Sequence, residues 1–498
     1  MRARVILALD QGTSSSRAIV FDRQGKPIGA AQHEVLSAYP APGRVEQDAD
    51  VLVETQLRAA REALDAAGVV AAEVAAIGIT NQRETTIAWD RDGRPLAPAI
   101  VWQDRRTAAS CAAFRAGGHE PAVRARTGLL LDPYFSATKM AWLLEALPDG
   151  RRRAAAGEIL LGTVDSYLAW RLTGGRTFAT DASNASRTLL LDLERRSWSP
   201  ELLDLFGVPL EALPEVRPTD GGFGETSPDF LGAPVPILAA VGDQQAALFG
   251  QACLAPGEAK NTYGTGCFLL MTTGSRPPVP PPGLLATVAW ERRGQGPTYA
   301  LEGSVFVAGA AVRWLRDGLG IIADAAEVEP LARSVPDSGG VVVVPAFAGL
   351  GAPYWDPDAR GTITGITAGT TRAHIARATL EAIAHQTADL VEALEAGGAP
   401  PLQLLRADGG AAGNDLLLQL QADLIGRPVA PAAVRETTAL GAALLAGRAA
   451  GFWESDEDLR SLAAPARVFE PQQGDAWRAE MRGRWAEAVA RARSRARA

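Results

Sequence analysis

The chain has few of the residues that cross-link or anchor a protein. Its 498 residues include only three cysteines, and none of them forms the CxxC spacing of a metal or redox site. No apolar run approaches the ~20 residues that a membrane-spanning helix needs, and residues 5–9 are too short for the core of a signal peptide. These absences argue against a disulfide framework, a structural zinc site and a membrane span. They predict a protein of the reducing cytoplasm.

Positive charge is scarce as well. The net charge is −8, and only three of the 49 basic residues are lysines. A nucleic-acid partner would need a broad basic face, so we expect none. Hydrophobic residues make up 47% of the chain and charged residues 21%, as in ordinary globular proteins, but 498 residues exceed what one hydrophobic core supports. We therefore expect two large domains, residues 1–250 and residues 251–498.

Two short loops rich in glycine and hydroxyl residues are the most informative feature that is present. The first occupies residues 8–17 (ALDQGTSSSR) and the second residues 261–268 (NTYGTGCF), one in each half of the chain. Alternating apolar runs flank both loops, which predicts the turn of a β-hairpin in each case. Glycine lets backbone N–H groups point together at an anion, and threonine and serine add hydroxyl donors. The pair predicts two phosphate-binding turns that face one another across a polyphosphate.

The first loop differs from the phosphate-binding motifs of P-loop proteins and protein kinases. The chain has no GxxxxGK[ST] loop, no GxGxxG after a strand, and no HRD or DFG pair. Instead, Asp10 places a carboxylate beside a group of N–H and hydroxyl donors. Such a carboxylate can hold Mg²⁺ near phosphates, usually through water. The alternative is that it only caps the β-turn.

Polar pairs follow two apolar runs that we interpret as buried strands. These pairs are Arg83-Glu84 and Asp243-Gln244. Ligands of open α/β sheets gather at such strand ends. Asp243 is therefore either the N-cap of the next helix or a catalytic base. A buried charged pair such as Arg83-Glu84 is costly without partners, and a polyol is a natural partner.

A third polar turn separates a predicted strand at residues 402–407 from a predicted helix at residues 415–425. Adjacent glycines at residues 408–410 (DGG) let a flat group approach the backbone, and Asn414 can hydrogen-bond a base or a ribose. A plain strand-to-helix turn is the alternative interpretation.

The order of the predicted elements repeats in the two halves. Each half begins with a strand-rich meander and continues with alternating helices and strands, which predicts two related α/β domains with the active site in the cleft between them. At the C-terminus, one apolar stripe predicts an amphipathic helix that packs on the second domain. Its members are Trp477, Met481, Trp485 and Val489. We interpret the arginines around this stripe and at the end of the chain as a solvated face.

With these motifs in place, the sequence resembles the glycerol kinase family, part of the sugar kinases that share the fold of actin and of the Hsp70 ATPase. The likeness runs nearly end to end and, besides the two loops, includes residues 78–86, 100–103, 132–136, 185–188, 242–250, 344–357 and 365–381. It implies two ribonuclease H-like domains with an interdomain active-site cleft. It also implies that the γ-phosphate of ATP passes to a terminal hydroxyl of glycerol, giving glycerol 3-phosphate and ADP, with Mg²⁺ as cofactor.

The resemblance also implies roles for particular residues. Those that match the binders of the glycerol hydroxyls are Arg83, Glu84, Tyr134, Asp243 and Gln244, and those that pack on its carbon chain are Trp102 and Phe268. Phosphate and nucleotide contacts are implied for Thr13, Ser14, Ser15, Arg17, Thr265, Gly309, Arg313, Gly410 and Asn414. Asp10 matches the magnesium-side carboxylate, and we expect Asp243 to accept the proton of the attacking hydroxyl. Relatives form dimers or tetramers, so a homodimer or homotetramer is expected.

Three departures from the family pattern bear on nucleotide binding and regulation. Arg313 stands where the family often has glutamine, which would alter ATP contacts modestly. Residues 230–235 lack the Gly-Thr-Arg of members that bind fructose bisphosphate. Residues 222–224 have no neighbouring histidine like the one that is phosphorylated in other members. Neither mode of regulation is therefore expected.

Two other functions remain open at this point. One is a kinase for another small polyol or sugar, such as a pentulose or gluconate, on the same scaffold. The aromatic wall of Trp102 and Phe268 favours glycerol, because it leaves little room beyond three carbons. The other is an ATP-gated binding protein of the Hsp70 or actin type. The two polar pairs argue against it, because such a protein needs no polyol pocket.

Overall fold

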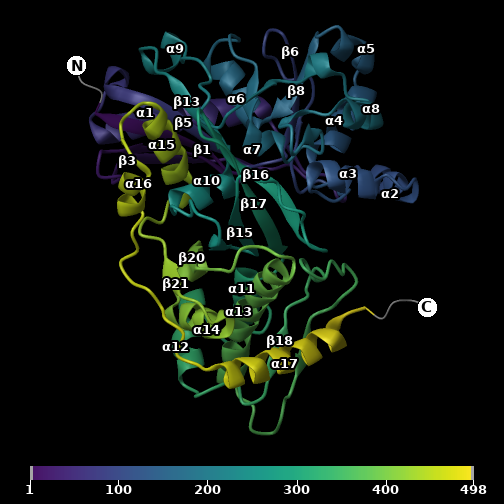
Figure 1. Ribbon diagram of the computed structural model, residues 1–498, viewed down its shortest axis with the longest axis vertical. Coiled ribbons are helices and arrows are strands. Elements are labelled where there is room, and N and C mark those ends of the chain that lie inside the picture. Colours follow the sequence, from purple (N-terminus) through teal and green to yellow (C-terminus); the bar gives the residue numbers. More distant parts are fainter. Residues whose placement is uncertain (1–3, 495–498) are drawn as a thin grey trace.

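The computed structural model describes residues 4–494 and contains two main sheets, one in each half of the chain (Figure 1). The first sheet, in the upper part of Figure 1, has the strand order β13-β5-β1-β2-β3. Its strands are β1 (Val5–Gln11), β2 (Ser15–Phe21), β3 (Pro27–Glu34), β5 (Val74–Asn81) and β13 (Ile237–Gly242). β1, β2 and β3 form an antiparallel meander, and β5 and β13 run parallel to β1.

The second sheet repeats this plan in the other half of the chain. Its order is β16-β17-β15-β14-β20-β21. The strands are β14 (Glu258–Tyr263), β15 (Cys267–Gly274), β16 (Leu285–Arg292), β17 (Gly296–Val305), β20 (Leu404–Asp408) and β21 (Val429–Pro431). β14, β15 and β17 are antiparallel neighbours, and β20 and β21 continue the sheet in parallel from β14. Apart from the edge strand β16, both sheets therefore have the same strand directions.

The helices that cover these sheets begin and end at the residues that local chemistry favours. α1 (Ala49–Ala67) has Asp48 as its N-cap, with backbone N–H groups donating to the side chain, and Gly68 at φ 63° as its C-cap. α13 (Arg372–Ala396) and α14 (Asp415–Ile425) cover the second sheet, and α14 matches the predicted helix at both ends.

One helix of the second half packs on the first sheet. α15 (Thr437–Ala449) follows β21 and lies against β5 and against α10 (Asp243–Gly250), in the upper part of Figure 1. Small residues allow this approach: a Cβ atom on Gly78 would lie 2.1 Å from the carbonyl oxygen of Ala442, and one on Gly441 1.8 Å from that of Ala246. The backbones are therefore in direct contact, and a larger side chain at either glycine would separate them.

Smaller elements complete both halves. A four-stranded sheet in the first half has the order β4-β7-β6-β8, with β4 (Glu46–Gln47), β6 (Thr86–Asp90), β7 (Ala99–Ile100) and β8 (Ile159–Thr163). The other first-half elements are α2 (Ala108–Ala116), α3 (Glu120–Thr127), α4 (Ser136–Ala146), α5 (Gly150–Ala155), α6 (Val164–Leu172), β9 (Ala179–Asp181), α7 (Ala182–Ala185), β10 (Leu191–Asp192), β11 (Ser197–Trp198), α8 (Pro200–Phe206), β12 (Glu215–Arg217) and α9 (Pro228–Leu231). Those of the second half are α11 (Gly309–Asp317), α12 (Val328–Arg333), β18 (Val342–Val344), β19 (Thr362–Thr364), α16 (Asp456–Leu462) and α17 (Asp475–Ala492).

The C-terminal helix packs as its stripe predicts. Trp485 and Val489 of α17 are buried against β18, and Trp477 and Met481 pack on the core of the second half. Residues 495–498, the last part of the arginine-rich end, lie outside the described residues. Within residues 4–494, no helix combines the length and the apolar character that crossing a bilayer requires.

Candidate active site

The carboxyl ends of three parallel strands bring acidic and basic side chains of the first half together. In the register of the sheet, Thr80 of β5 lies between Asp10 of β1 and Val241 of β13. Asp243 follows β13 directly, and Arg83 stands two residues beyond the end of β5. All three charged residues therefore extend from one edge of the sheet, where ligands of α/β folds bind.

Asp243 lies where the two halves of the chain meet. Its Oδ1 accepts the backbone N–H of Gln244 at 2.7 Å and lies 3.4 Å from Nε of Arg83. The N-cap of α10 is Gly242, so the capping alternative for Asp243 does not hold. Burial raises the pKa of Asp243, and the charges on Arg83 and Lys260 act against that rise. Its side chain nevertheless remains 30% exposed, so it is accessible to a ligand.

Four charged side chains beside Asp243 form a buried network, which we call the central cluster. Glu302 of β17 accepts from Nη1 and Nη2 of Arg83 at 2.7 and 3.0 Å, and also from Nη2 of Arg187 at 3.1 Å. Nε of Arg187 donates to Glu84 at 2.7 Å. Each side chain is at most 2% exposed. The members of the central cluster are Arg83, Glu84, Arg187 and Glu302.

The backbone at Glu84 is held in an unusual conformation. Its φ of 63° lies in the left-handed region, which is costly for a residue other than glycine. The carbonyl oxygen of Glu84 accepts from Oγ of Ser136 at 3.1 Å and from Nζ of Lys139 at 3.2 Å. Burial lowers the pKa of Lys139 to about 8. This support keeps the Glu84 carboxylate on Arg187 and close to Arg83.

An aromatic pair lies next to the central cluster. The rings of Trp102 and Tyr134 meet edge to face with centroids 5.5 Å apart. Nε1 of Trp102 donates to Oγ1 of Thr13 at 2.9 Å, and Tyr134 accepts from Nη2 of Arg83 at 3.4 Å. Trp102, a predicted wall residue, is thus hydrogen-bonded to the first hairpin turn and packs against Tyr134, a predicted polyol binder.

Phe268 comes to the same region from the second half. It stands opposite Ser304 in the pairing of β15 with β17, and its neighbour two residues on, Leu270, stands opposite Glu302. Phe268 and Glu302 therefore share one face of the sheet. Phe268 is half-buried.

A second group of charges surrounds the first hairpin turn. Asp10 is almost fully buried, and burial raises its pKa to about 7, with an opposing effect of Arg17 and smaller contributions from Asp243 and Glu436. Arg17 forms an ion pair with Glu436, which immediately precedes α15. Ser15 is the first residue of β2 and is buried, whereas Ser14 beside it is exposed. The turn is closed by a hydrogen bond from N of Gly12 to O of Ser15 at 2.9 Å.

The second hairpin turn is fixed to the start of α11. Backbone N–H groups of Ala308 and Ala310 donate to the carbonyl oxygen of Thr265, and Arg313 donates to its Oγ1 at 2.9 Å. A Cβ atom on Gly309 would lie 2.6 Å from the carbonyl oxygen of Gly264, so close packing alone requires glycine there. Three residues predicted to contact nucleotide therefore lie together: Thr265, Gly309 and Arg313.

In the third predicted turn, at residues 408–414, one residue borders open space and another has a structural role. A Cβ atom on Gly410 would meet nothing within 4 Å, whereas one on Gly409 would lie 2.5 Å from the carbonyl oxygen of Tyr263. Asn414 is the N-cap of α14, and its Oδ1 accepts the backbone N–H of Leu417 at 2.9 Å. Gly410 therefore leaves space for a ligand, while the side-chain oxygen of Asn414 serves the helix. The nucleotide roles of both stay predictions.

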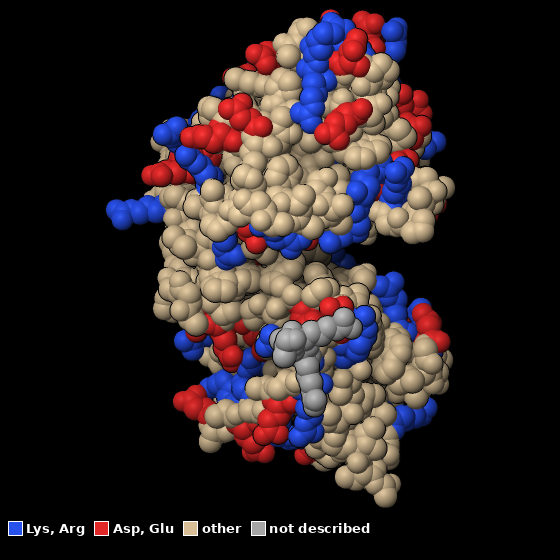
Figure 2. Space-filling model, turned by 90° about the vertical axis from the view of Figure 1, so that its right-hand side faces the viewer, with Lys and Arg blue, Asp and Glu red and all other residues tan. Residues whose placement is uncertain are grey.

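The surface is hollowed between the two parts of the molecule. Figure 2 shows this groove on one face, with lysine and arginine side chains along its borders. A groove with positive charge at its edges is suited to an anionic ligand such as a nucleotide.

Comparison with known proteins identifies the family to which this architecture belongs. Residues 5–250 match the N-terminal domain of the FGGY family of carbohydrate kinases, and residues 259–450 match its C-terminal domain. The chain belongs to the FGGY family of carbohydrate kinases. It is 59% identical over 489 residues to the glycerol kinase of Trichlorobacter lovleyi, covering 98% of both chains. It is 58% identical to the glycerol kinase of Aromatoleum aromaticum, again covering 98% of both.

Solved structures agree with this assignment. The crystal structure of Plasmodium falciparum glycerol kinase with ADP matches with a TM-score of 0.94 at 35% identity, covering 99% of this chain and 98% of that one. A xylulose kinase from Rhodospirillum rubrum matches with a TM-score of 0.85 at 25% identity, covering 98% of each chain. The resemblance to glycerol kinases and the predicted two-domain α/β fold are thus confirmed.

The site of this FGGY kinase contains charged residues to which the sequence interpretation gave no role. Arg187 lies in one of the strings that carried the resemblance, but its pairing with Glu84 was not predicted. Glu302 is a charge inside the apolar strand β17, which was a signal for a buried ion pair. Glu436 has no such signal, because only the packing of α15 on the first sheet brings it to Arg17.

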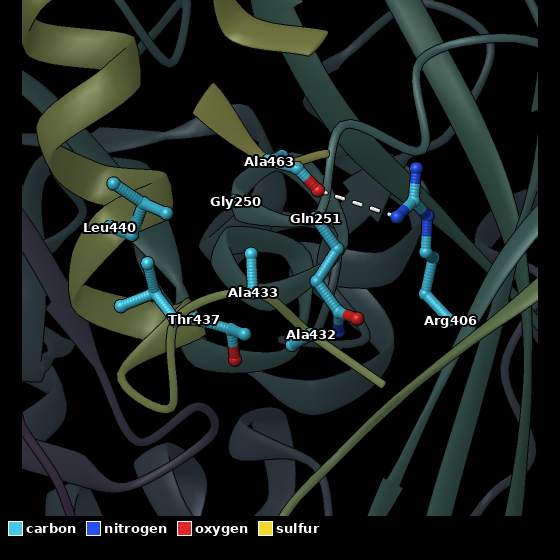
Figure 3. A pocket seen from close by; sticks show the side chains of 9 residues that line it. Gly250, Gln251, Arg406, Ala432, Ala433, Thr437, Leu440 and Ala463 are labelled. Atoms are coloured by element: carbon cyan, nitrogen blue, oxygen red, sulfur yellow. Dashed lines mark hydrogen bonds between the residues drawn. The ribbon is translucent and has the colours of Figure 1, made fainter. Parts of the chain in front are cut away.

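The FGGY kinase has another hollow at the far end of α10 (Figure 3). Figure 3 shows Gln251 between Thr437 and Arg406 in this hollow. Gln251 and Thr437 both donate to Oδ2 of Asp408, at 2.8 and 2.5 Å, and Arg406 donates to the carbonyl oxygen of Ala463 at 3.3 Å. These contacts join the segments that connect the two halves. The hollow lies at the opposite end of the helix from Asp243.

Proposed function

We propose that the protein is a glycerol kinase that transfers the γ-phosphate of ATP to a terminal hydroxyl of glycerol, giving glycerol 3-phosphate and ADP. The observation that carries the proposal is the position of Asp243. It is partly exposed, lies 3.4 Å from Arg83, and shares a sheet edge with Asp10 and the first hairpin turn. The relatives at 58–59% identity that bear the name glycerol kinase support the choice of substrate.

Glycerol is small and uncharged, so its binding energy comes from a few hydroxyl contacts and an apolar wall. The proposed hydroxyl binders are Arg83, Glu84, Tyr134, Asp243 and Gln244. Gln244 accepts a hydrogen bond from the buried Lys260, which also donates to Thr262 at 2.9 Å, so its amide is held in place. Trp102 and Phe268 form the proposed wall against the carbon chain.

Phosphoryl transfer at this site needs one proton acceptor and a set of anion-binding groups. The terminal hydroxyl oxygen forms a bond to the γ-phosphorus, the bond between that phosphorus and the β,γ-bridging oxygen breaks, and ADP leaves. Asp243 takes the hydroxyl proton, for which its burial-raised pKa is suited. The proposed phosphate and nucleotide contacts are Thr13, Ser14, Ser15, Arg17, Thr265, Gly309, Arg313, Gly410 and Asn414. Preorganised donors around the transferring group supply most of the stabilisation in such reactions.

The residues around Asp10 fit a magnesium ion. Burial and neighbouring carboxylates raise the pKa of Asp10 to about 7, so its anionic form gains from a nearby cation. Residues 4–494 contain no group of three or more His, Cys, Asp or Glu side chains that could hold a metal together. Asp10 would therefore hold the ion with waters and phosphate oxygens as the other ligands. When bound, Mg²⁺ would neutralise charge on the β- and γ-phosphates.

We also propose that the enzyme is a homodimer or homotetramer of the cytoplasm. Its three cysteines are free and buried, which suits a reducing compartment. The oligomeric state follows from the family resemblance alone. Light scattering on the eluate of a sizing column would give the mass of the particle and decide between one, two and four copies.

The deciding experiment is the release of ADP by purified protein with Mg-ATP and a panel of acceptors. We expect turnover with glycerol, slower turnover with dihydroxyacetone, and little with erythritol, xylulose or gluconate. A kinase for another polyol or sugar is the second candidate, since xylulose kinases share the fold. Faster turnover with a larger acceptor would favour that candidate. ATP turnover that no polyol changes would exclude both.

A further inference from the structure

The guanidinium of Arg83 has almost no free donor for a substrate. Nη1 donates to Glu302 at 2.7 Å and to Gln245 at 3.2 Å. Nη2 donates to Glu302 at 3.0 Å and to Tyr134 at 3.4 Å. An arginine has five N–H donors, and four of them are thus directed at protein groups. The remaining donor, Nε, lies 3.4 Å from Oδ1 of Asp243 and 3.8 Å from Oε1 of Glu84.

Glu302 determines which N–H donor of Arg83 remains available to a substrate. It comes from β17 in the second half of the chain, and both of its carboxylate oxygens bind Arg83 of the first half. Such a two-point contact fixes the plane of the guanidinium as well as its position. Glu302 has no exposed surface, and the charges on Arg187 and Arg83 lower its pKa to about 2 against the effect of burial, so it remains anionic. Arg187 is fully buried too and donates at 3.1 Å to Oε1 of Glu302, the oxygen that also accepts from Nη2 of Arg83.

We propose that Glu302 is a positioning residue of the polyol site, which the second half of the chain supplies to orient Arg83 toward the reacting hydroxyl. The inference rests on the proposed function and deepens it. With the plane of Arg83 fixed, a hydroxyl that accepts from its Nε–H must lie beside Asp243. The same contact makes the polyol site dependent on how the two halves are joined, because neither half alone contains both partners.

The test compares the wild type with Glu302→Gln and Glu302→Asp. Glutamine keeps the shape but places an amide N–H against an arginine N–H, so the two-point contact is lost. We expect the KM for glycerol to rise about tenfold to a hundredfold, with the KM for ATP within about twofold. Aspartate restores the charge on a shorter side chain, so its KM for glycerol should lie between the two. Equilibrium dialysis of labelled glycerol gives the same comparison as a Kd, without turnover.

Glu291→Gln is the matched control. Glu291 lies on the adjacent strand β16 and pairs with Arg196 of the first half at 3.1 Å, so this variant also removes an ion pair between the halves. We expect its KM for glycerol to stay within about twofold of the wild type.

The outcomes separate this inference from the proposed function. A wild type that does not phosphorylate glycerol overturns both. An active wild type with an unchanged KM for glycerol in folded Glu302→Gln overturns the inference alone. Parallel increases in the KM for ATP and for glycerol, with no recovery in Glu302→Asp, would show a merely structural role and also overturn it. If Glu302→Gln does not fold, the KM values of Glu302→Asp decide.

Discussion

Two buried clusters of charged residues differ in whether a side chain beside or within them remains available to a ligand. The central cluster joins residues from both halves beside Asp243, whose side chain is 30% exposed. The other group, which we call the α17 cluster, fixes the C-terminal helix. There Asp389 accepts from Arg482, from Tyr354 at 3.0 Å and from Trp485 at 2.9 Å. Its members are Tyr354, His385, Asp389, Arg482 and Trp485.

The difference shows when a buried charge is functional. In the α17 cluster both oxygens of Asp389 are taken by protein donors, and the ring of His385 stacks on Trp485 with centroids 5.0 Å apart. The Asp389 carboxylate therefore has no oxygen left for a ligand, and we interpret the cluster as a packing element. The central cluster contains an equally satisfied pair, Arg83 and Glu302, but the Nε of that arginine has no hydrogen-bond partner within residues 4–494 and lies 3.4 Å from the partly exposed Asp243 carboxylate. Changes in the central cluster should therefore affect activity, and changes in the α17 cluster should affect stability.

The largest effect is expected from Asp243→Asn. Asparagine keeps the hydrogen bond from the N–H of Gln244 but cannot accept the hydroxyl proton. We expect kcat to fall by about 10²- to 10⁴-fold, with glycerol affinity within a few fold and little change in Tm. Steady-state kinetics and calorimetry check this. Largely intact turnover would remove Asp243 as the base.

Arg482→Met should have the converse effect. Methionine keeps much of the length of the side chain but leaves Asp389 buried with one donor fewer, and loss of one partner of a buried pair costs about 3 kcal/mol of unfolding free energy. Urea unfolding gives this value, and kcat at 25 °C should stay close to the wild type. A loss of activity at full stability would show that the α17 cluster acts on the site.

The sequence correctly predicted those helices and hairpins whose ends are marked by strong local signals such as turn glycines and helix caps. Both hairpins were predicted from glycine turns between apolar runs and are present. α14 was predicted between Asn414 and Gly426, and these residues are its N-cap and its C-cap at φ 63°. Such signals act over a few residues, so a single chain is enough to find them.

Contacts between distant segments were beyond this kind of reasoning. Arg83 and Glu302 are 219 positions apart, and Arg17 and Glu436 are 419 apart. Periodicity indicates that a residue is buried, but it does not name the partner that the fold supplies. The packing of α15 on the first sheet was missed for the same reason. The residue roles predicted from the family resemblance are separate from this, and they stay predictions until the variants are measured.

A smaller effect is expected from Arg83→Lys, which sharpens the comparison inside the central cluster. Lysine keeps the charge but cannot hold both oxygens of Glu302. We expect the KM for glycerol to rise about tenfold, with a smaller decrease in kcat. Arg196→Lys, which alters the ion pair with Glu291, is the matched control. Equal KM values for the two variants would mean that the fork of Arg83 does not orient substrate.

The smallest effect concerns pH and the α17 cluster. Burial, together with the charges on Arg482 and Arg484, holds the pKa of His385 well below 6.5. The unfolded chain protonates this ring near pH 6.5, and the folded chain does not, so the unfolded state binds more protons below that pH. Stability from this group is therefore complete above pH 6.5 and falls by about 1.4 kcal/mol for each unit below it.

His385→Phe isolates this contribution, because phenylalanine can still stack on Trp485 but does not titrate. Unfolding by urea at pH 7.5 and at pH 5.5 should show that the wild type loses about 1.4 kcal/mol more than the variant over this interval. All other carboxylates and histidines titrate in both proteins, so they cancel in the difference. Equal losses would mean that His385 takes up its proton in the folded state despite its burial beside Arg482 and Arg484. The α17 cluster would then accept a proton in the folded state, and its description as a cluster fully satisfied by protein groups, in contrast to the central cluster, would not hold.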